Sequence, residues 1–148
     1  MMSEQLFLFN SPAKINLGLR ILNRRKDGYH NLDTIFCELE FGDELQFTES
    51  NKFELTAEGI NVPTDDSNLI YKVYKKLKSK IKEDIPEYKI HLNKQIPIGA
   101  GLGGGSSNAG ITIKALNQLW KLNLSLDEMY SIAENLGADV PFFIKGGV

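Results

Sequence analysis

A glycine-rich run followed by two serines is the part of this sequence best suited to chemistry. Residues 97–108 read PIGAGLGGGSSN, with five glycines between positions 99 and 105. Glycine at this density either adopts backbone angles that other residues refuse or lets a ligand approach the main chain closely. The run follows an alternating, strand-like pattern at residues 88–92 and precedes an apolar helical pattern from Ile111. A flexible linker is therefore the weaker interpretation, because linkers are usually polar on both sides.

A glycine loop between a strand and a helix suits a phosphate group, since it offers unpaired N–H groups at the positive end of the helix dipole. Gly99, Gly101 and Gly104 satisfy the spacing G-x-G-x-x-G, but the βαβ unit and the downstream acidic residue of a dinucleotide site are not indicated. A Walker lysine does not follow the glycines, and the protein-kinase strings H-R-D and D-F-G do not occur. The run indicates a third kind of phosphate loop.

Two charged residues could complete a phosphoryl-transfer site. Asp139 stands in the apolar context G-A-D-V-P-F-F, where it is either a turn or cap residue or a carboxylate that needs a partner. Lys14 and Asn16 lie on the polar face of an alternating strand at Ala13–Ile21. Lys14 is either an ordinary exposed strand lysine or a cation that stabilises negative charge developing in a reaction. A phosphate loop, a cation and a carboxylate together suggest phosphoryl transfer to a hydroxyl group.

Composition narrows the class of protein. The 148 residues fit one domain, and 17 basic against 19 acidic side chains give a net charge of −2, so we expect no nucleic-acid partner. No apolar run approaches the roughly 20 residues of a membrane span, and no signal-peptide pattern opens the chain, so we expect a cytoplasmic protein without a membrane partner. The single cysteine, Cys37, excludes an internal disulfide and fits a reducing compartment. We expect it to be a buried small hydrophobe on the face of Ile35 and Leu39.

The periodicity predicts an α+β fold in which strands come first and helices later. Strands are expected at 6–9, 13–21, 31–41 and 45–48, with turns at 23–28 and 42–44 and a continuation of the meander at 53–55. A helix should start after the capping cluster at 65–68 and end before Pro86, and another should follow the glycine loop. Ser125 and Glu128 form a capping box for a third helix that Gly137 stops.

Three stretches together resemble the GHMP kinase superfamily of small-molecule kinases: residues 12–17 (PAKINL), 97–107 (PIGAGLGGGSS) and 137–141 (GADVP). The string DGYH at 27–30 is similar to the branch that acts on a cytidine diphosphate conjugate. The resemblance spans almost the whole chain. It implies a fold like ribosomal protein S5 domain 2, with a largely antiparallel sheet packed with helices. Residues 1–148 would form the family's N-terminal, ATP-binding domain, and its second domain is absent from this chain.

The resemblance also implies an activity. ATP, with Mg²⁺ bridging its phosphates, would phosphorylate the 2-hydroxyl of 4-diphosphocytidyl-2-C-methyl-D-erythritol, a precursor in the non-mevalonate route to isoprenoids. Asp139 would be the catalytic base, and Lys14 the catalytic lysine paired with it. ATP would bind Asn68, Lys94, Pro97, Gly99, Ala100, Gly101, Leu102, Gly103, Gly104, Gly105, Ser106 and Ser107. The small-molecule substrate would bind Asn16, Tyr29, His30 and Phe36. Ser106 or Ser107 would touch Mg²⁺ or cap the following helix; the Mg²⁺ ligands and the oligomeric state are not indicated.

Two alternatives remain open at this point. The chain could belong to another GHMP kinase that acts on homoserine or mevalonate, although DGYH makes little sense for so small a substrate. It could also be a non-catalytic nucleotide- or RNA-binding module, since a fold of this kind does not fix function. The near-neutral charge argues against RNA binding.

Overall fold

A computed structural model describes residues 4–148, apart from the side chains of Leu19 and Leu32. In these residues the strands β1 (Leu6–Arg24), β2 (His30–Ser50), β3 (Glu54–Gly59) and β4 (Glu87–Lys94) form one sheet in the order β1-β2-β4-β3. β2 pairs antiparallel with both β1 and β4, whereas β3 runs parallel to β4. The prediction of an α+β fold with a largely antiparallel sheet is confirmed.

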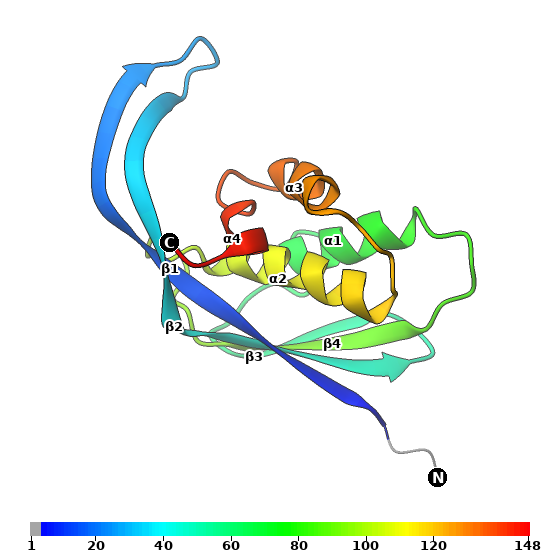
Figure 1. Cartoon of the computed structure of the whole chain (residues 1–148). Helices are drawn as coiled ribbons and strands as arrows, with labels where there is room; N and C mark the ends of the chain where they lie inside the picture. The colour runs from blue at the N-terminus through cyan, green and yellow to red at the C-terminus, as the bar shows by residue number, and fades with distance from the viewer. Residues whose placement is uncertain (1–3) are drawn as a thin grey trace.

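The helices cover one face of this sheet (Figure 1). They are α1 (Leu69–Lys78), α2 (Gly104–Leu119), α3 (Leu126–Glu134) and the short α4 (Phe142–Lys145). The core between helices and sheet contains Leu45, Phe47, Ile90, Leu92, Val73, Leu77, Ile113 and Leu116, all at most 1% exposed. Trp120 also belongs to this core, as predicted, and its indole N–H donates to the carbonyl of Pro86 at 2.8 Å.

The first two strands are longer than the sequence pattern predicts. The expected strands at 6–9 and 13–21 are one strand, β1, and the turn predicted at 42–44 lies inside β2. Gly42 pairs with Pro12 and Asp43 with Ser11, next to an irregularity between Pro12 and Lys14. A Cβ atom at position 42 would overlap the Ser11 carbonyl oxygen. Gly42 is therefore required by the close approach of β1, and the prediction of a turn was wrong.

The predicted continuation of the meander also differs, whereas the prediction that the first helix ends before Pro86 is confirmed. β3 does not continue the meander, because it pairs with β4 at the far edge of the sheet after α1 has carried the chain across. α1 ends at Lys78, several residues before Pro86, although Ile81 still packs against the core. The capping box of α3 is confirmed: Ser125 Oγ accepts from the Glu128 N–H at 3.2 Å, and Glu128 Oε2 accepts from the Ser125 N–H at 2.7 Å.

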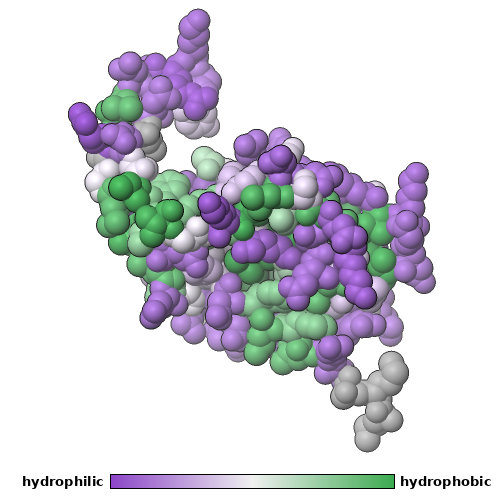
Figure 2. All heavy atoms as spheres, viewed as in Figure 1, coloured by the Kyte–Doolittle hydropathy of each residue, from purple (hydrophilic) through white to green (hydrophobic). Residues whose placement is uncertain are grey.

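β1 and β2 extend beyond the body of the protein as a two-stranded arm (Figure 1). Its tip is a tight turn in which the Gly28 N–H donates to the Arg25 carbonyl at 3.1 Å, and Gly28 has a φ of 90°. This confirms the Asp-Gly turn, although β1 continues to Arg24. Hydrophobic side chains gather where the arm leaves the body (Figure 2). Leu17 of β1 and its pairing partner Ile35 of β2 are 47% and 55% exposed. Cys37 is only partly buried, so the prediction of a buried thiol was wrong.

Candidate active site

Residues 95–103 form the loop that links β4 to α2. Gly99, Gly101 and Gly103 have φ angles of 71°, 77° and 70°, in the left-handed region that side chains other than glycine rarely adopt. Gly103 is also closely packed, because a Cβ atom there would lie 3.0 Å from Lys14 Cγ and 3.1 Å from Phe143 Cζ. The density of glycine thus follows from both backbone conformation and a close approach to β1 and α4.

The loop ends at an uncapped helix N-terminus. Gly103 is the N-cap of α2, and this residue makes no side-chain capping hydrogen bond. The first N–H groups of a helix have no partner within it and stand at the positive end of its dipole. Such a terminus favours an anion, phosphate in particular.

A cavity of about 500 Å³ opens at this terminus, within the size range of small-molecule sites. It is lined by Val62, Pro63, Ser67, Asn68, Leu69, Leu92, Lys94, residues 97–106 and Asn108. Every residue predicted to bind ATP is in this lining except Ser107. The members that sequence reasoning missed are Val62, Pro63, Ser67, Leu69, Leu92, Ile98 and Asn108; for the segment before α1, the capping cluster at 65–68 was the available signal.

The N-terminus of α1 forms one wall of the cavity. Asn68 Oδ1 accepts from the Ile70 N–H at 2.9 Å, and Asn68 Nδ2 donates to the Pro63 carbonyl at 2.8 Å. Asp65 accepts from the Ser67 hydroxyl at 2.6 Å, and this hydrogen bond is the main reason why the pKa of Asp65 lies below its usual range. These contacts hold Ser67 and Asn68 in place beside the glycine loop.

The two serines after the glycines have different environments. Ser106 lines the cavity, whereas Ser107 is fully buried with its Oγ 2.9 Å from Ser11 Oγ. The Ser107 N–H donates to the Gly103 carbonyl at 2.8 Å, so it is already paired. Ser107 therefore does not face the cavity, and since α2 begins at Gly104, neither serine is its N-cap.

Lys14 and Asp139, 125 positions apart in the sequence, form an ion pair. β1 carries Lys14, and the turn between α3 and α4 carries Asp139; Lys14 Nζ lies 3.5 Å from Asp139 Oδ2. The lysine side chain is only 6% exposed, while the aspartate side chain is 37% exposed. The ammonium group is thus buried in the protein, and the carboxylate remains partly accessible from outside.

Two predicted substrate residues surround the same ammonium group. Asn16 Oδ1 accepts from Lys14 Nζ at 2.5 Å, because the alternation of β1 puts both side chains on one face. The Phe36 ring centroid lies 4.7 Å from Nζ, and this ring packs edge-on against Phe142 at 5.3 Å. The structure therefore brings Lys14, Asn16, Phe36 and Asp139 together.

The ion pair adjoins the glycine loop. The Lys14 N–H donates to the Leu102 carbonyl at 2.9 Å, and the lysine side chain packs against Gly103. A second cavity, of about 510 Å³, opens beside Phe36 between β2 and the α3–α4 segment. It is lined by Thr34, Ile35, Phe36, Tyr130, Pro141, Phe142, Lys145, Gly146 and Val148. The cavity at the glycine loop and a second, largely apolar cavity thus lie near the same charged pair.

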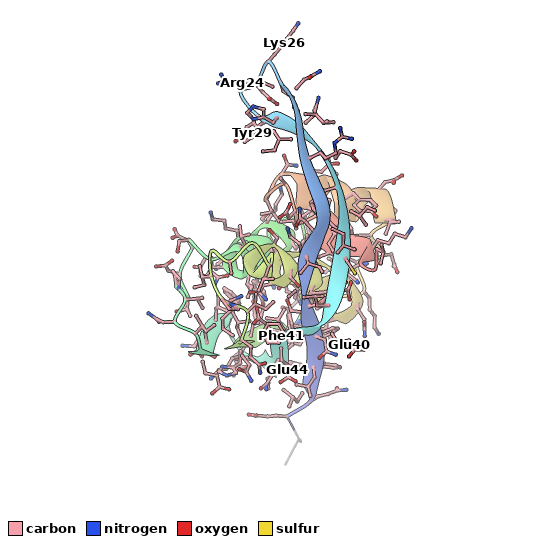
Figure 3. All side chains as sticks on the ribbon, turned by 90° about the vertical axis from the view of Figure 1, so that its left-hand side faces the viewer. Arg24, Lys26, Tyr29, Glu40, Phe41 and Glu44 are labelled. Carbon is pink, nitrogen blue, oxygen red and sulfur yellow. The ribbon has the colours of Figure 1, made fainter. Side chains whose placement is uncertain are left out.

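Tyr29 and His30 are not brought to this pair. Tyr29 is 73% exposed at the tip of the arm, where Figure 3 shows it with Arg24 and Lys26, away from the helices. Neither Tyr29 nor His30 is in the lining of the two cavities. Their assignment to the cytidine group stays a prediction.

Residues 4–148 contain no group of metal-ligating side chains and no helix that could span a membrane. In this part of the chain no three His, Cys, Asp or Glu side chains come close enough together to hold a metal ion. Of the helices described, none is long and apolar enough to cross a membrane.

The family model for the GHMP kinases N terminal domain matches residues 68–147, from the N-cap of α1 to just past α4. The chain therefore belongs to the GHMP kinase family, and the resemblance seen in its motifs is confirmed.

Among curated relatives, the chain is 48% identical over 139 residues to the 4-diphosphocytidyl-2-C-methyl-D-erythritol kinase of Marinobacter nauticus, covering 92% of this chain and 48% of that protein. It is 44% identical over 140 residues to the enzyme of the same name from Pelodictyon phaeoclathratiforme, covering 93% and 48%. The chain thus spans about half the length of these relatives.

Two solved kinase structures share the fold of this chain. A crystal structure of 4-(cytidine 5'-diphospho)-2C-methyl-D-erythritol kinase superposes with a TM-score of 0.77 at 38% identity, over 93% of this chain and 48% of the other. The mevalonate kinase of Methanococcus jannaschii superposes with a TM-score of 0.63 at 19% identity, over 99% and 48%, and shares the fold.

Proposed function

We propose that this chain is the N-terminal, ATP-binding domain of a small-molecule kinase that phosphorylates the 2-hydroxyl of 4-diphosphocytidyl-2-C-methyl-D-erythritol. The observation that carries the proposal is the Lys14–Asp139 pair, 3.5 Å apart beside a glycine loop that ends at an uncapped helix N-terminus. The names of the relatives at 44–48% identity support the choice of substrate. The isoprenoid precursor pathway follows from that substrate, and a cytoplasmic location is part of the same proposal.

The residues at the loop suit the phosphates of ATP. The N–H groups of residues 104–106 and the dipole of α2 would hold the phosphate oxygens, and Lys94 and Asn68 line the same cavity. The cavity lining contains hydroxyl and amide groups but, among the described residues, no carboxylate. Mg²⁺ would therefore be held mainly by the phosphates, with the hydroxyl and amide groups of the lining as the side-chain ligands available to it, and it would supply neutralisation of the developing charge.

Asp139 and Lys14 would act on the acceptor hydroxyl. Asp139 accepts the hydroxyl proton as the acceptor oxygen bonds to the γ-phosphorus, and the bond from that phosphorus to the β–γ bridging oxygen breaks to release ADP. Lys14 holds the carboxylate and the hydroxyl in place and stabilises negative charge that develops between them. We place the acceptor toward the second cavity, where Phe36 and Phe142 offer an apolar wall.

A coupled ADP-release assay with the full-length natural protein, ATP, Mg²⁺ and the cytidine diphosphate conjugate tests this function. Asp139→Asn should lower turnover by about 100-fold or more. Asp84→Asn, which changes an exposed carboxylate outside both cavities, should leave turnover unchanged. Turnover with homoserine or mevalonate but not with the conjugate would identify a different GHMP substrate. If the folded wild-type protein turned over none of these alcohols, the proposal that it is a small-molecule kinase would be refuted.

A further inference from the structure

A buried polar cluster lies directly beneath the glycine loop. It consists of Asp43 from β2, Lys94 from β4 and Asn108 from α2, none more than 4% exposed. Lys94 Nζ lies 2.7 Å from Asp43 Oδ2 and 3.3 Å from Asn108 Oδ1. A charged pair so completely removed from water needs several further hydrogen bonds.

Asp43 supplies those bonds through both carboxylate oxygens. Oδ1 accepts from the backbone N–H groups of Gln95 and Ile96 at 2.6 and 2.7 Å, at the point where β4 leaves the sheet for the loop. Oδ2 accepts from Lys94 Nζ at 2.7 Å and from Asn108 Nδ2 at 2.9 Å. One side chain therefore fixes the entry to the loop, a buried ammonium group and the second turn of α2.

The cluster also reaches the surface that would meet the nucleotide. Lys94 and Asn108 both line the phosphate cavity. A Cβ atom at Gly104 would lie 2.6 Å from Lys94 Nζ, so the ammonium group supports the first residue of α2 from below. The geometry of the first turn of α2 thus depends on where Asp43 holds Lys94.

We propose that Asp43 is a positioning residue for ATP that acts through Lys94, a deepening of the kinase function proposed above. It holds the ammonium group under the first turn of α2, so that the lysine and the N–H groups of that turn face the phosphates together. Asp43 itself does not touch the nucleotide, since it is absent from the cavity lining. Its loss should weaken nucleotide binding and leave the acceptor site intact.

The substitution Asp43→Asn isolates this role. It retains an oxygen for the Gln95 and Ile96 N–H groups but removes the charge that holds Lys94. Removing one member of a buried pair leaves the other uncompensated, whereas replacing both is often neutral for stability. Lys94→Met and the double variant therefore complete a double-mutant cycle in which stability and ATP binding can be separated.

The experiment measures ATP binding by calorimetry and the KM values for ATP and for the cytidine diphosphate conjugate, with the full-length natural protein. Asp43→Asn should weaken ATP binding by about tenfold or more while the acceptor KM stays within about twofold, the scale of losing a charge-assisted hydrogen bond. In the Lys94→Met background, Asp43→Asn should have little further effect on ATP binding, and the double variant should unfold at a higher denaturant concentration than Asp43→Asn.

Ser11→Ala is the matched control. Ser11 Oγ accepts from Asn108 Nδ2 at 2.8 Å and lies 2.9 Å from Ser107 Oγ in the same buried region. This hydroxyl group has no bond to Asp43, to Lys94 or to the loop entry, so its loss should leave the position of the ammonium group and the ATP affinity unchanged. Unchanged ATP affinity in folded Asp43→Asn, or equal effects of that change with and without Lys94, would overturn the proposal. A wild-type protein that neither binds nor uses ATP would refute the kinase function itself, and this inference with it.

Discussion

Adjacent glycines at the start of α2 should respond in opposite ways to the same added methyl group. A Cβ atom at Gly104 would lie 2.6 Å from Lys94 Nζ and 3.0 Å from Ile96 Cγ2, whereas nothing lies within 4 Å of a Cβ atom at Gly105. The ammonium end of a lysine side chain usually moves away from an added methyl group at little cost in free energy. Lys94 cannot, because it is buried and held 2.7 Å from Asp43.

These distances give the size of the effect. Overpacking of a buried site costs about 1–3 kcal/mol, and the better helix propensity of alanine returns about 0.5–1 kcal/mol. Gly104→Ala should therefore lower the free energy of unfolding by up to about 2.5 kcal/mol, a fall of about 2–4 °C in Tm per kcal/mol for a chain of this size. Gly105→Ala should leave stability unchanged or raise it by up to about 1 kcal/mol.

Urea unfolding of both variants and the wild type, followed by circular dichroism, measures the difference. Gly105→Ala serves as the control for helix propensity, since both positions lie in the first turn of α2. Because Gly105 lines the phosphate cavity, its methyl group should weaken ATP binding without loss of stability. Equal unfolding midpoints for the two alanine variants would refute the reasoning, since they would mean that Lys94 moves freely.

Three further predictions follow from other contacts. Gly110→Ala would put a Cβ atom 2.8 Å from Phe143 Cβ, so we expect a loss of about 1–3 kcal/mol in urea unfolding; an unchanged midpoint would contradict the packing of α2 against α4. Burial acts to raise the pKa of Glu87, but hydrogen bonds from Lys78 and Tyr74 at 2.9 and 2.6 Å outweigh it and lower the pKa overall. The stabilisation by this carboxylate is therefore present above its unfolded pKa of about 4.3 and is lost as pH falls through the lower folded value; the stability difference from Glu87→Gln should shrink below about pH 4, and a constant difference would argue against it. Asp139→Asn should lower kcat by about 100-fold or more with little change in the unfolding midpoint, because the Asp139 side chain is 37% exposed; a large loss of stability would instead indicate a structural carboxylate.

Local patterns predicted the parts of the site that depend on neighbouring residues. The alternation of β1 correctly placed Lys14 and Asn16 on one face, where they form a hydrogen bond. The capping signals correctly located the starts of α1 and α3. Glycine density correctly indicated a loop before a helix, because left-handed backbone angles are a local requirement.

Contacts between distant residues explain what the patterns missed. Gly42-Asp43 has the composition of a turn, yet it continues β2 because Ser11 packs against Gly42 and Lys94 neutralises Asp43, 51 positions away. Ser107 looks like a ligand or cap residue, but the register of α2 turns its hydroxyl toward Ser11. Burial and pairing of this kind depend on which distant segments meet in the fold. The spacing of apolar and polar residues within one segment does not determine which segments meet.

The order of strands in the sheet also has a consequence for synthesis on the ribosome. β4 separates β2 from β3, although both of these strands leave the ribosome before it does. Until residues 87–94 emerge, β3 has no neighbour to pair with, and the apolar face that carries Leu45, Phe47 and Leu55 lacks the cover of α2. Long-range pairing of this kind is slow and leaves intermediates prone to aggregation. The nascent chain therefore cannot complete its sheet strand by strand, and stable folding must wait until α2 has been translated.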